Sequence, residues 1–140
     1  MAAPLYLYTG PEFGEREDAI IEIKQSLKKK YGSVDEHLFY LVETPFNQVM
    51  TILQSGTLFS DAICIVCKNA ELLKKKDDLQ MISDWLESAE ETAVLILVSD
   101  EISVDAKLTK LVPTSNKKQF WEMFEDKKLP WIYNFIKKNG

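Results

Sequence analysis

The sequence predicts a three-layer α/β/α fold built on a five-stranded, mostly parallel sheet. Two segments, residues 62–67 and 93–98, are apolar at every position. A strand that is apolar throughout must be covered on both faces, as the central strands of a parallel sheet are. Segments with strand and helix character also alternate along the chain, which indicates parallel strands joined by covering helices.

The first half of the chain is expected to hold two strands and two helices. The strands are predicted at residues 5–8 and 36–42, where apolar and β-branched or aromatic residues gather. A helix over 15–31 separates them and stops at Gly32, and a short helix follows the second strand with Thr44 as its cap. The inner faces of these helices are expected to be formed by Ile20, Ile23, Leu27, Tyr31, Val49, Ile52 and Leu53.

The second half contains both fully apolar strands, each followed by helical sequence. A helical region is predicted over 69–88, and a shorter helix over 104–111 precedes a proline. A fifth strand is predicted at 117–121, at an edge of the sheet. The inner face of the longer helical region is expected to contain Leu79, Met81, Ile82, Trp85 and Leu86.

The chain is expected to be one domain followed by the start of another element. With 140 residues, it can bury a core without a metal or a disulfide. An amphipathic helix containing Trp131, Ile132, Phe135 and Ile136 is predicted to begin after the sheet is complete. It is either the last helix of this domain or the first of a further one, and we favour the second. The predicted domain therefore spans residues 1–128, and 129–140 begin the linker or the next domain.

Charge and composition exclude several classes of protein. Seventeen basic and twenty-two acidic side chains give a net charge of −5, which argues against a domain that wraps nucleic acid by itself. The sequence has no long apolar span and no signal peptide, so we expect no membrane partner and a cytoplasmic location. Two cysteines in such a chain are expected to be reduced thiols.

Cys64 and Cys67 have the CxxC spacing of some metal and redox sites, but they lie within an apolar strand. Residues three apart on a strand point to opposite faces, so these two cannot share a tetrahedral metal. His37 is the only histidine, and no second cysteine pair exists. The sequence therefore predicts no metal site.

The loop after the first strand aligns with a phosphate-binding loop but lacks its chemistry. Such a loop reads GxxxxGK[ST]: its glycines let amides wrap the phosphates, its lysine neutralises them and its hydroxyl binds magnesium. Aligned on Gly10, this chain has Glu15, Arg16 and Glu17 in place of the second glycine, the lysine and the hydroxyl. Two carboxylates there would repel a triphosphate. The spacing suggests a loop that keeps its length and has lost nucleotide binding, so we expect no cofactor and no catalytic residues.

The end of the third strand supports the same conclusion. A hydrolysing P-loop enzyme carries an acidic residue there to hold magnesium, whereas this chain has Lys68 and Asn69. A phosphoacceptor receiver domain would need an aspartate at this place and an acidic pair after the first strand, and both are missing. A flavodoxin-like FMN site would need a loop richer in hydroxyls and glycines. The sequence predicts a binding or structural module on a nucleotide-binding scaffold.

Seven short segments, in order, carry a resemblance to a known family. They are an apolar strand with a degenerate loop (5–13), a charged helix start (15–20), a Leu-Phe turn between small residues (55–61), Lys68-Asn69-Ala70, Leu72-Leu73-Lys74, Ser99-Asp100 and a Leu-Pro-Trp-Ile stretch (129–132). The set spans the whole chain and resembles the N-terminal domain of the delta subunit of the bacterial DNA polymerase III clamp loader.

The resemblance implies a RecA-like domain of the AAA+ type, a P-loop NTPase fold that has lost ATP binding. In that family the domain binds the ring-shaped sliding clamp (the beta subunit) and helps to open it. The subunit belongs to a DNA polymerase holoenzyme, a nucleotidyltransferase, although this part is not itself an enzyme. The family also implies contacts with other loader subunits through C-terminal domains missing here, and with primed DNA only in the assembled complex.

The family's clamp contact is a hydrophobic plug, and it matches the segment formed by Gly56, Thr57, Leu58 and Phe59. The match is best at Leu58 and Phe59. The residues alone also allow another interpretation, in which the pair closes the domain's own core between the second helix and the third strand.

Two other functions stay open from the residues alone. One is a small regulatory domain that responds to a nucleotide or phosphate through a divergent site at residues 10–17. The other is an ATPase whose site is completed in an oligomer by another chain. Binding of ATP with magnesium separates the first of these from the clamp-loader interpretation.

Overall fold

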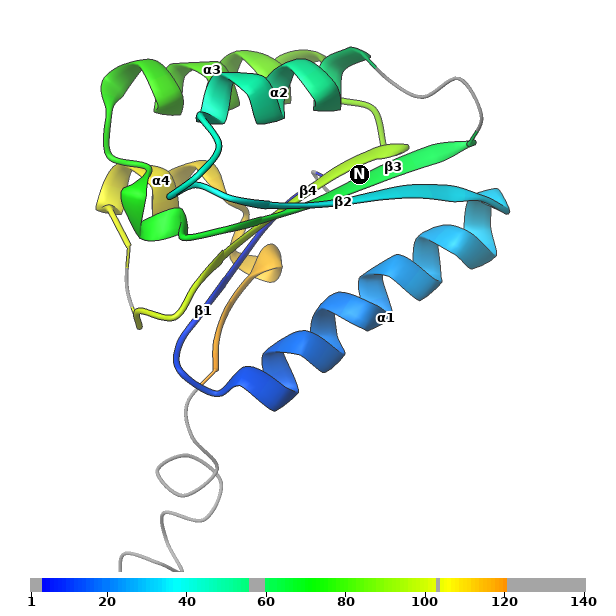
Figure 1. Ribbon diagram of the computed structural model, residues 1–140, viewed down its shortest axis with the longest axis horizontal. Coiled ribbons are helices and arrows are strands. Elements are labelled where there is room, and N and C mark those ends of the chain that lie inside the picture. Colours follow the sequence, from blue (N-terminus) through cyan, green and yellow to red (C-terminus); the bar gives the residue numbers. More distant parts are fainter. Residues whose placement is uncertain (1–3, 56–59, 103, 121–140) are drawn as a thin grey trace, which may run out of the picture.

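The computed structural model describes residues 4–55, 60–102 and 104–120. Its strands form one sheet in the order β2-β3-β4-β1-β5, and every pairing is parallel. Helices lie on both faces of this sheet (Figure 1). The elements are β1 (Leu5–Thr9), α1 (Phe13–Tyr31), β2 (Val34–Tyr40), α2 (Phe46–Ser55), β3 (Ala62–Lys68), η1 (Ala70–Leu72), α3 (Lys76–Ser88), β4 (Ala93–Ser99), α4 (Ala106–Leu111), η2 (Thr114–Asn116) and β5 (Lys117–Gln119).

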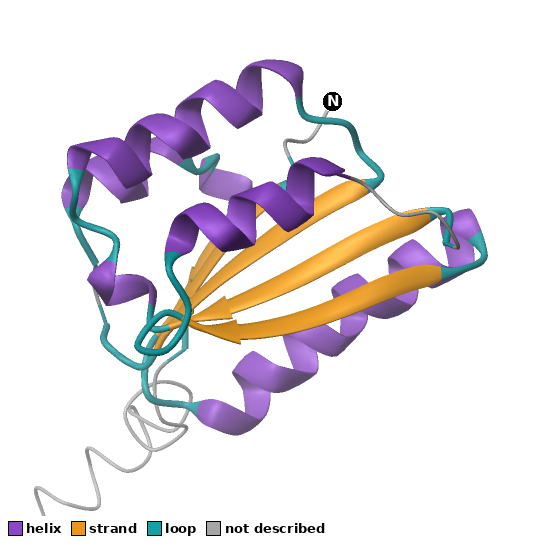
Figure 2. Ribbon diagram, turned by 45° about the horizontal axis from the view of Figure 1, so that its top comes forward, coloured by secondary structure: helices purple, strands orange, loops and turns teal. Residues whose placement is uncertain are grey.

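The predicted three-layer architecture is confirmed. One face of the sheet is covered by α2, α3 and α4, and the other by α1 (Figure 2). Side chains of β3 alternate between the two cores: Ile63 and Ile65 pack on the α2 and α3 side, and Val66 packs on the α1 side. Both cores include side chains of β3 and β4, which explains why the middle of each strand is apolar.

The two cysteines face opposite sides of β3, as the spacing predicted. Cys67 belongs to the core beneath α2 and α3, and Cys64 to the core beneath α1. Burial raises the pKa of each thiol to about 12, so both are protonated at neutral pH. They are core side chains on opposite faces of the sheet and cannot share a metal ion.

The predicted helical region over 69–88 is wrong in one respect, because it is two elements. The short turn η1 ends at Leu72, and α3 begins only at Lys76. Asn69 precedes η1 with a left-handed backbone (φ 68°), and Lys75, just before α3, is extended (ψ 141°), so no continuous helix spans this region. Asp77 and Asp78 lie in the first turn of α3, where acidic side chains favour a helix start.

Several predicted boundaries also move, among them those of β2 and β5. β2 ends at Tyr40 and not at residue 42, because the amides of Glu43 and Thr44 both bind the Tyr40 carbonyl and form a turn. β5 is an edge strand as predicted, and it spans Lys117–Gln119. The expected domain boundary at residue 128 and the segment 129–140 lie outside the described residues.

Within the described part of the chain, none of the helices has the length and apolar character needed to cross a bilayer. Among the same residues, no three His, Cys, Asp or Glu side chains lie close enough together to hold a metal ion.

Candidate functional site

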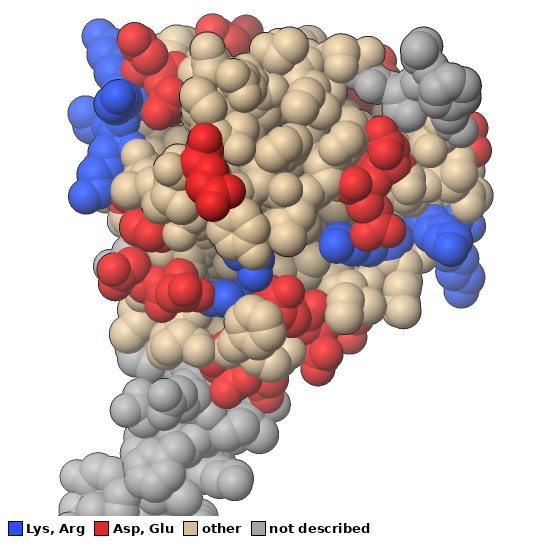
Figure 3. All heavy atoms as spheres, in the orientation of Figure 1, with Lys and Arg blue, Asp and Glu red and all other residues tan. Residues whose placement is uncertain are grey.

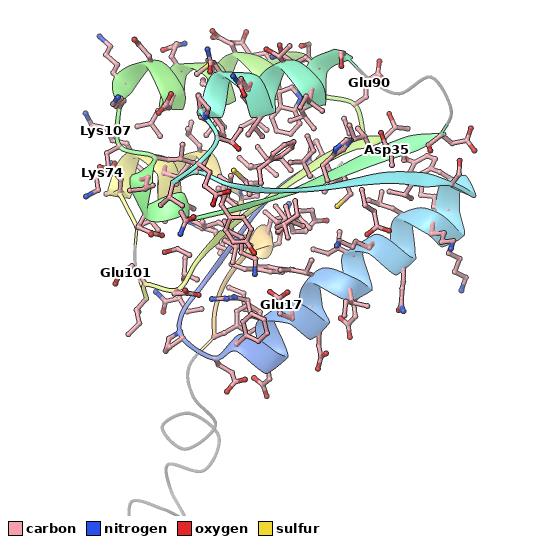
Figure 4. The ribbon with its side chains drawn as sticks, in the orientation of Figure 1. Glu17, Asp35, Lys74, Glu90, Glu101 and Lys107 are labelled. Carbon is pink, nitrogen blue, oxygen red and sulfur yellow. The ribbon has the colours of Figure 1, made fainter. Side chains whose placement is uncertain are left out.

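The loop after β1 and the end of β3 come together at one edge of the sheet. In a parallel sheet all strands end at the same edge, so Thr9, Lys68 and Ser99 close β1, β3 and β4 side by side. Figure 4 shows Glu17 projecting from the start of α1 toward these strands. Ligands of open α/β sheets bind at this carboxyl edge.

The N-terminus of α1 is occupied by a carboxylate of the chain itself. Glu12 caps the helix: its Oε1 accepts hydrogen bonds from the amides of Gly14 (2.8 Å) and Glu15 (3.2 Å). Free amides at a helix start are the groups that bind a phosphate in a phosphate-binding loop. Here they bind an acidic side chain, which would repel a phosphate.

The expectation that the loop keeps the length of a phosphate-binding loop is wrong. α1 already begins at Phe13, so only residues 10–12 connect it to β1. Glu15, Arg16 and Glu17, which align with the functional positions of the motif, lie inside the helix. Their amides take part in the helix and its cap, so they cannot wrap a ligand. The early cap at Glu12 is the physical reason.

Gly10 is held where no other residue fits. Its φ is +107°, and a Cβ built on it would lie 2.1 Å from the carbonyl oxygen of Phe120. Its amide lies near two carbonyl oxygens, those of Ser99 (3.1 Å) and Glu101 (2.8 Å). The chain after β5 therefore packs directly on the turn at residues 10–12, because the Phe120 carbonyl oxygen also accepts a hydrogen bond from the Glu12 amide (3.1 Å).

Arg16 replaces the motif's lysine and binds the protein itself. Its side chain is 1% exposed. Nη1 donates to the carbonyl oxygens of Gly10 (2.7 Å) and Ser99 (3.2 Å) and lies 2.7 Å from Asp100 Oδ1. The guanidinium thus ties the end of β4 to the end of β1. A cation that neutralises phosphates in a P-loop has become a structural link here.

Lys68 is also neutralised within the chain. Its Nζ lies 3.0 Å from Glu17 Oε2, and both Lys68 and Arg16 lie near the ring of Phe13, at 5.2 Å and 5.5 Å from its centroid. Phe13 itself is 60% exposed. The two cations at this edge are therefore matched by two carboxylates and lie against an aromatic ring, an arrangement with no excess positive charge for a triphosphate.

The end of β3 has lost the geometry of a magnesium site. Lys68 is followed by Asn69 in a left-handed conformation, and the nearby carboxylate of Glu71 accepts a hydrogen bond from the Ser99 hydroxyl (2.7 Å). The same hydroxyl oxygen accepts from the amide of Glu101 at 3.0 Å. These groups link η1 to the turn after β4.

The predicted degenerate motifs therefore do meet in space. Gly10, Glu15, Arg16 and Glu17 are brought to the same edge as Lys68 and Asn69, and the Glu17–Lys68 ion pair joins the two sets. Sequence reasoning missed Glu12 and Asp100, which complete the arrangement. Glu12 had a recognisable signal, because an acidic residue just before an amphipathic helix is a candidate cap. Asp100 had none.

The candidate clamp-binding residues lie outside the described residues. They are Gly56, Thr57, Leu58 and Phe59. The chain approaches this segment from α2, whose Leu53 is buried, and continues into β3, whose Ala62 is buried. Ser33 holds the start of β3: its hydroxyl oxygen accepts from the Asp61 amide (3.0 Å) and its carbonyl from the Ala62 amide (3.1 Å). These anchors lie at the amino edge of the sheet, opposite the degenerate phosphate loop.

Comparison with known proteins bears on the fold of the chain. No protein-family model matches the chain, and no curated protein matches it in sequence. The fold is similar to that of a solved clamp-loader protein. The chain superposes on the Bacillus subtilis DNA clamp loader delta protein (YqeN) with a TM-score of 0.70 over 99% of its length, at 18% sequence identity. It spans 44% of that protein, so the likeness shows the fold of one part of it.

Proposed function

We propose that this chain is the first domain of a clamp-loader delta subunit, which binds the sliding clamp and helps to open it during DNA replication. The observation that carries the proposal is a clamp-loader fold whose nucleotide site is filled by the protein's own Glu12 and Arg16. Such a domain would act by binding and would not hydrolyse ATP. It would be a non-catalytic subunit of a DNA polymerase III holoenzyme, a nucleotidyltransferase, in the cytoplasm.

The proposed clamp contact is the segment with Leu58 and Phe59, supported by Thr57 and Gly56. The buried residues on either side, Leu53 and Ala62, favour this role, because an anchor is most effective when its flanks are fixed in place. Burial of a Leu and a Phe in an apolar pocket is worth about 1.5–3 kcal/mol each. Two such anchors are enough to dominate a small interface.

The remaining proposed partners are other clamp-loader subunits and primed DNA. Contacts with other loader subunits would be made by domains that follow this one, and primed DNA would be met only in the assembled complex. The net charge of −5 agrees with a domain that does not hold DNA by itself.

Titration with ATP and magnesium tests the proposal against a nucleotide-responsive domain with a site at residues 10–17. We expect the melting temperature to stay unchanged, because Glu12 occupies the helix amides and Asp100 and Glu17 neutralise the two cations. A domain that binds ATP would be stabilised by about 2.7 kcal/mol at a hundredfold excess over Kd. Thermal unfolding followed by circular dichroism measures the difference, with a P-loop ATPase as the positive control. A rise in melting temperature would refute the proposed loss of nucleotide binding.

A further inference from the structure

The strand β2 forms one edge of the sheet, and alternate residues of its backbone point away from β3. The Leu41 amide, just after the strand, donates to the Lys68 carbonyl oxygen at 3.1 Å. Along a strand the direction of the amide and carbonyl groups reverses at each residue, so the odd-numbered residues of β2 bond β3. The amides of Glu36, Leu38 and Tyr40 therefore point to the outside of the sheet.

The outward-facing residues also carry exposed apolar side chains. Leu38 is 51% exposed and Tyr40 is 43% exposed. Because they are two residues apart, both side chains lie on the same face of the sheet. It is the face covered by α1, since Tyr40 lines a hollow together with Phe13 of that helix. An exposed edge strand with apolar side chains is a template for pairing with a further strand, which charged side chains would discourage.

Helix α1 extends this apolar region beyond the strand. Ile21 is 48% exposed. One turn before it Glu17 pairs with Lys68 (3.0 Å), and one turn after it Lys24 pairs with Glu36 of β2 (3.2 Å). Residues one turn apart share a flank of a helix, so Ile21 lies on the flank that faces β2. The name β2–α1 surface is used below for the exposed apolar side chains of this region, which are Phe13, Ile21, Leu38 and Tyr40.

Charged side chains border the β2–α1 surface and leave an acidic excess. β2 crosses the middle of the view in Figure 1, and Figure 3 shows uncharged side chains there with charged ones around them. The two ion pairs of α1 with β2 and β3 cancel. Asp35, near the start of β2, is 43% exposed and contacts the His37 ring at 3.0 Å, and Glu43 is exposed just after the strand ends. A segment with basic residues at its ends would meet a carboxylate at each end of β2.

These features select the kind of occupant. Backbone donors and acceptors at every second residue are matched by an extended chain, because its own groups repeat at the same spacing. A helix bonds its own backbone groups and would leave those of β2 to water. A second copy of this chain, with its net charge of −5, would add its own carboxylates to an edge that is already acidic.

We propose that β2 accepts an extended segment of a partner protein, which adds a further strand to this edge of the sheet. Alternate apolar side chains of the segment cover the β2–α1 surface, and basic residues at its ends face Asp35 and Glu43. The site uses neither Leu58 nor Phe59, so this proposal and the proposed clamp contact can fail independently.

Hydrogen exchange of the backbone amides in the 140-residue chain, followed by NMR, tests the proposal. The probe is the peptide acetyl-Lys-Val-Thr-Val-Thr-Val-Lys-amide, whose valines share one face when it is extended. At saturating peptide, we expect the amides of Glu36, Leu38 and Tyr40 to exchange more slowly by about tenfold or more. The amides of His37 and Phe39 already bond β3, so their rates should stay unchanged. Protection that alternates along β2 is the signature of a paired strand.

Two matched pairs of reagents separate strand pairing from other contacts. A peptide N-methylated at its central valine and at the next threonine keeps its side chains, but one methyl group faces β2 in any register, so it should give no protection. Leu38→Lys places a charge in the middle of the β2–α1 surface and should abolish the protection. Ile102→Lys changes an exposed apolar residue (38%) that lines a hollow with β5, at the opposite edge of the sheet, and should retain it. Both variants should keep the melting temperature of the wild type.

Three results would overturn the proposal. The first is a folded wild-type chain in which the peptide produces no alternating protection of β2. The second is equal protection by the N-methylated peptide, or by a peptide with glutamate in place of both lysines. The third is the same alternating protection without peptide as the chain concentration rises, which would assign this edge to a second copy of the chain.

Discussion

Replacement of Leu58 and Phe59 by alanine is expected to weaken binding to the sliding clamp by more than a hundredfold. Each side chain is expected to contribute about 1.5 kcal/mol or more through burial in an apolar pocket, and about 3 kcal/mol corresponds to slightly over two orders of magnitude in Kd. The effect should appear mainly as faster dissociation, because mutations within an interface change the dissociation rate more than the association rate. Surface plasmon resonance with the cognate clamp immobilised measures both rates.

The control for the double variant is its melting temperature, because the alternative interpretation places Leu58 and Phe59 over the domain's own core. The double variant should keep a melting temperature close to that of the wild type if the pair is an external anchor. A loss of several kcal/mol of stability, as large-to-small core substitutions cause, would support the core interpretation and contradict the proposed contact.

Replacement of Arg16 by methionine is expected to cost about 3 kcal/mol of stability. The buried guanidinium donates to the carbonyl oxygens of Gly10 and Ser99, and charge-assisted hydrogen bonds of this kind contribute about 1.5–3 kcal/mol each. Methionine keeps the apolar stem but leaves the Gly10 carbonyl without this donor. In a domain of this size the melting temperature should fall by roughly 10 °C. Denaturation by urea, followed by circular dichroism, gives the free energy of unfolding.

Asp100→Asn is the matched control for Arg16. Asp100 also contacts the guanidinium, but it is 84% exposed, so its ion pair is screened by water and should contribute less than about 1 kcal/mol. The structure therefore predicts a large effect for Arg16→Met and a small one for Asp100→Asn. Equal losses for the two variants, or an Arg16→Met protein as stable as the wild type, would show that the carbonyl contacts do not hold the two strand ends together.

The layers of the fold could be predicted because they depend on patterns that repeat over many residues. The apolar runs of β3 and β4 required cover on both faces, and the spacing of Ile20 and Leu27 defined the inner face of α1. The opposite orientation of Cys64 and Cys67 followed from the two-residue period of a strand. Each of these inferences holds even when an element boundary moves by one or two residues.

The details of the site could not be predicted because they depend on single contacts between distant segments. The spacing from Gly10 to Glu17 matched a phosphate-binding loop, but one capping bond from Glu12 starts the helix early and shortens the loop. The partners of Arg16 are carbonyl groups, and a sequence does not show where a backbone carbonyl will lie. Asn69 was predicted to lie in a helix. In the structure its left-handed backbone follows the end of β3 and separates that strand from η1.

The sequence places carboxylates and a lysine where the nucleotide-binding motif needs other groups, and the loss of nucleotide binding stays a prediction. The structure adds how the charges at this edge of the sheet are balanced. The charges are matched inside the chain, Arg16 with Asp100 and Lys68 with Glu17, so the edge needs no nucleotide to be stable.

We propose that this domain binds a sliding clamp without nucleotide. The most direct test is the binding of the wild-type chain to the immobilised cognate clamp by surface plasmon resonance, with and without ATP and magnesium. We expect saturable binding with the same Kd in both conditions. A chain that is folded by circular dichroism and does not bind the clamp, or that binds it only when ATP is present, would contradict the claim.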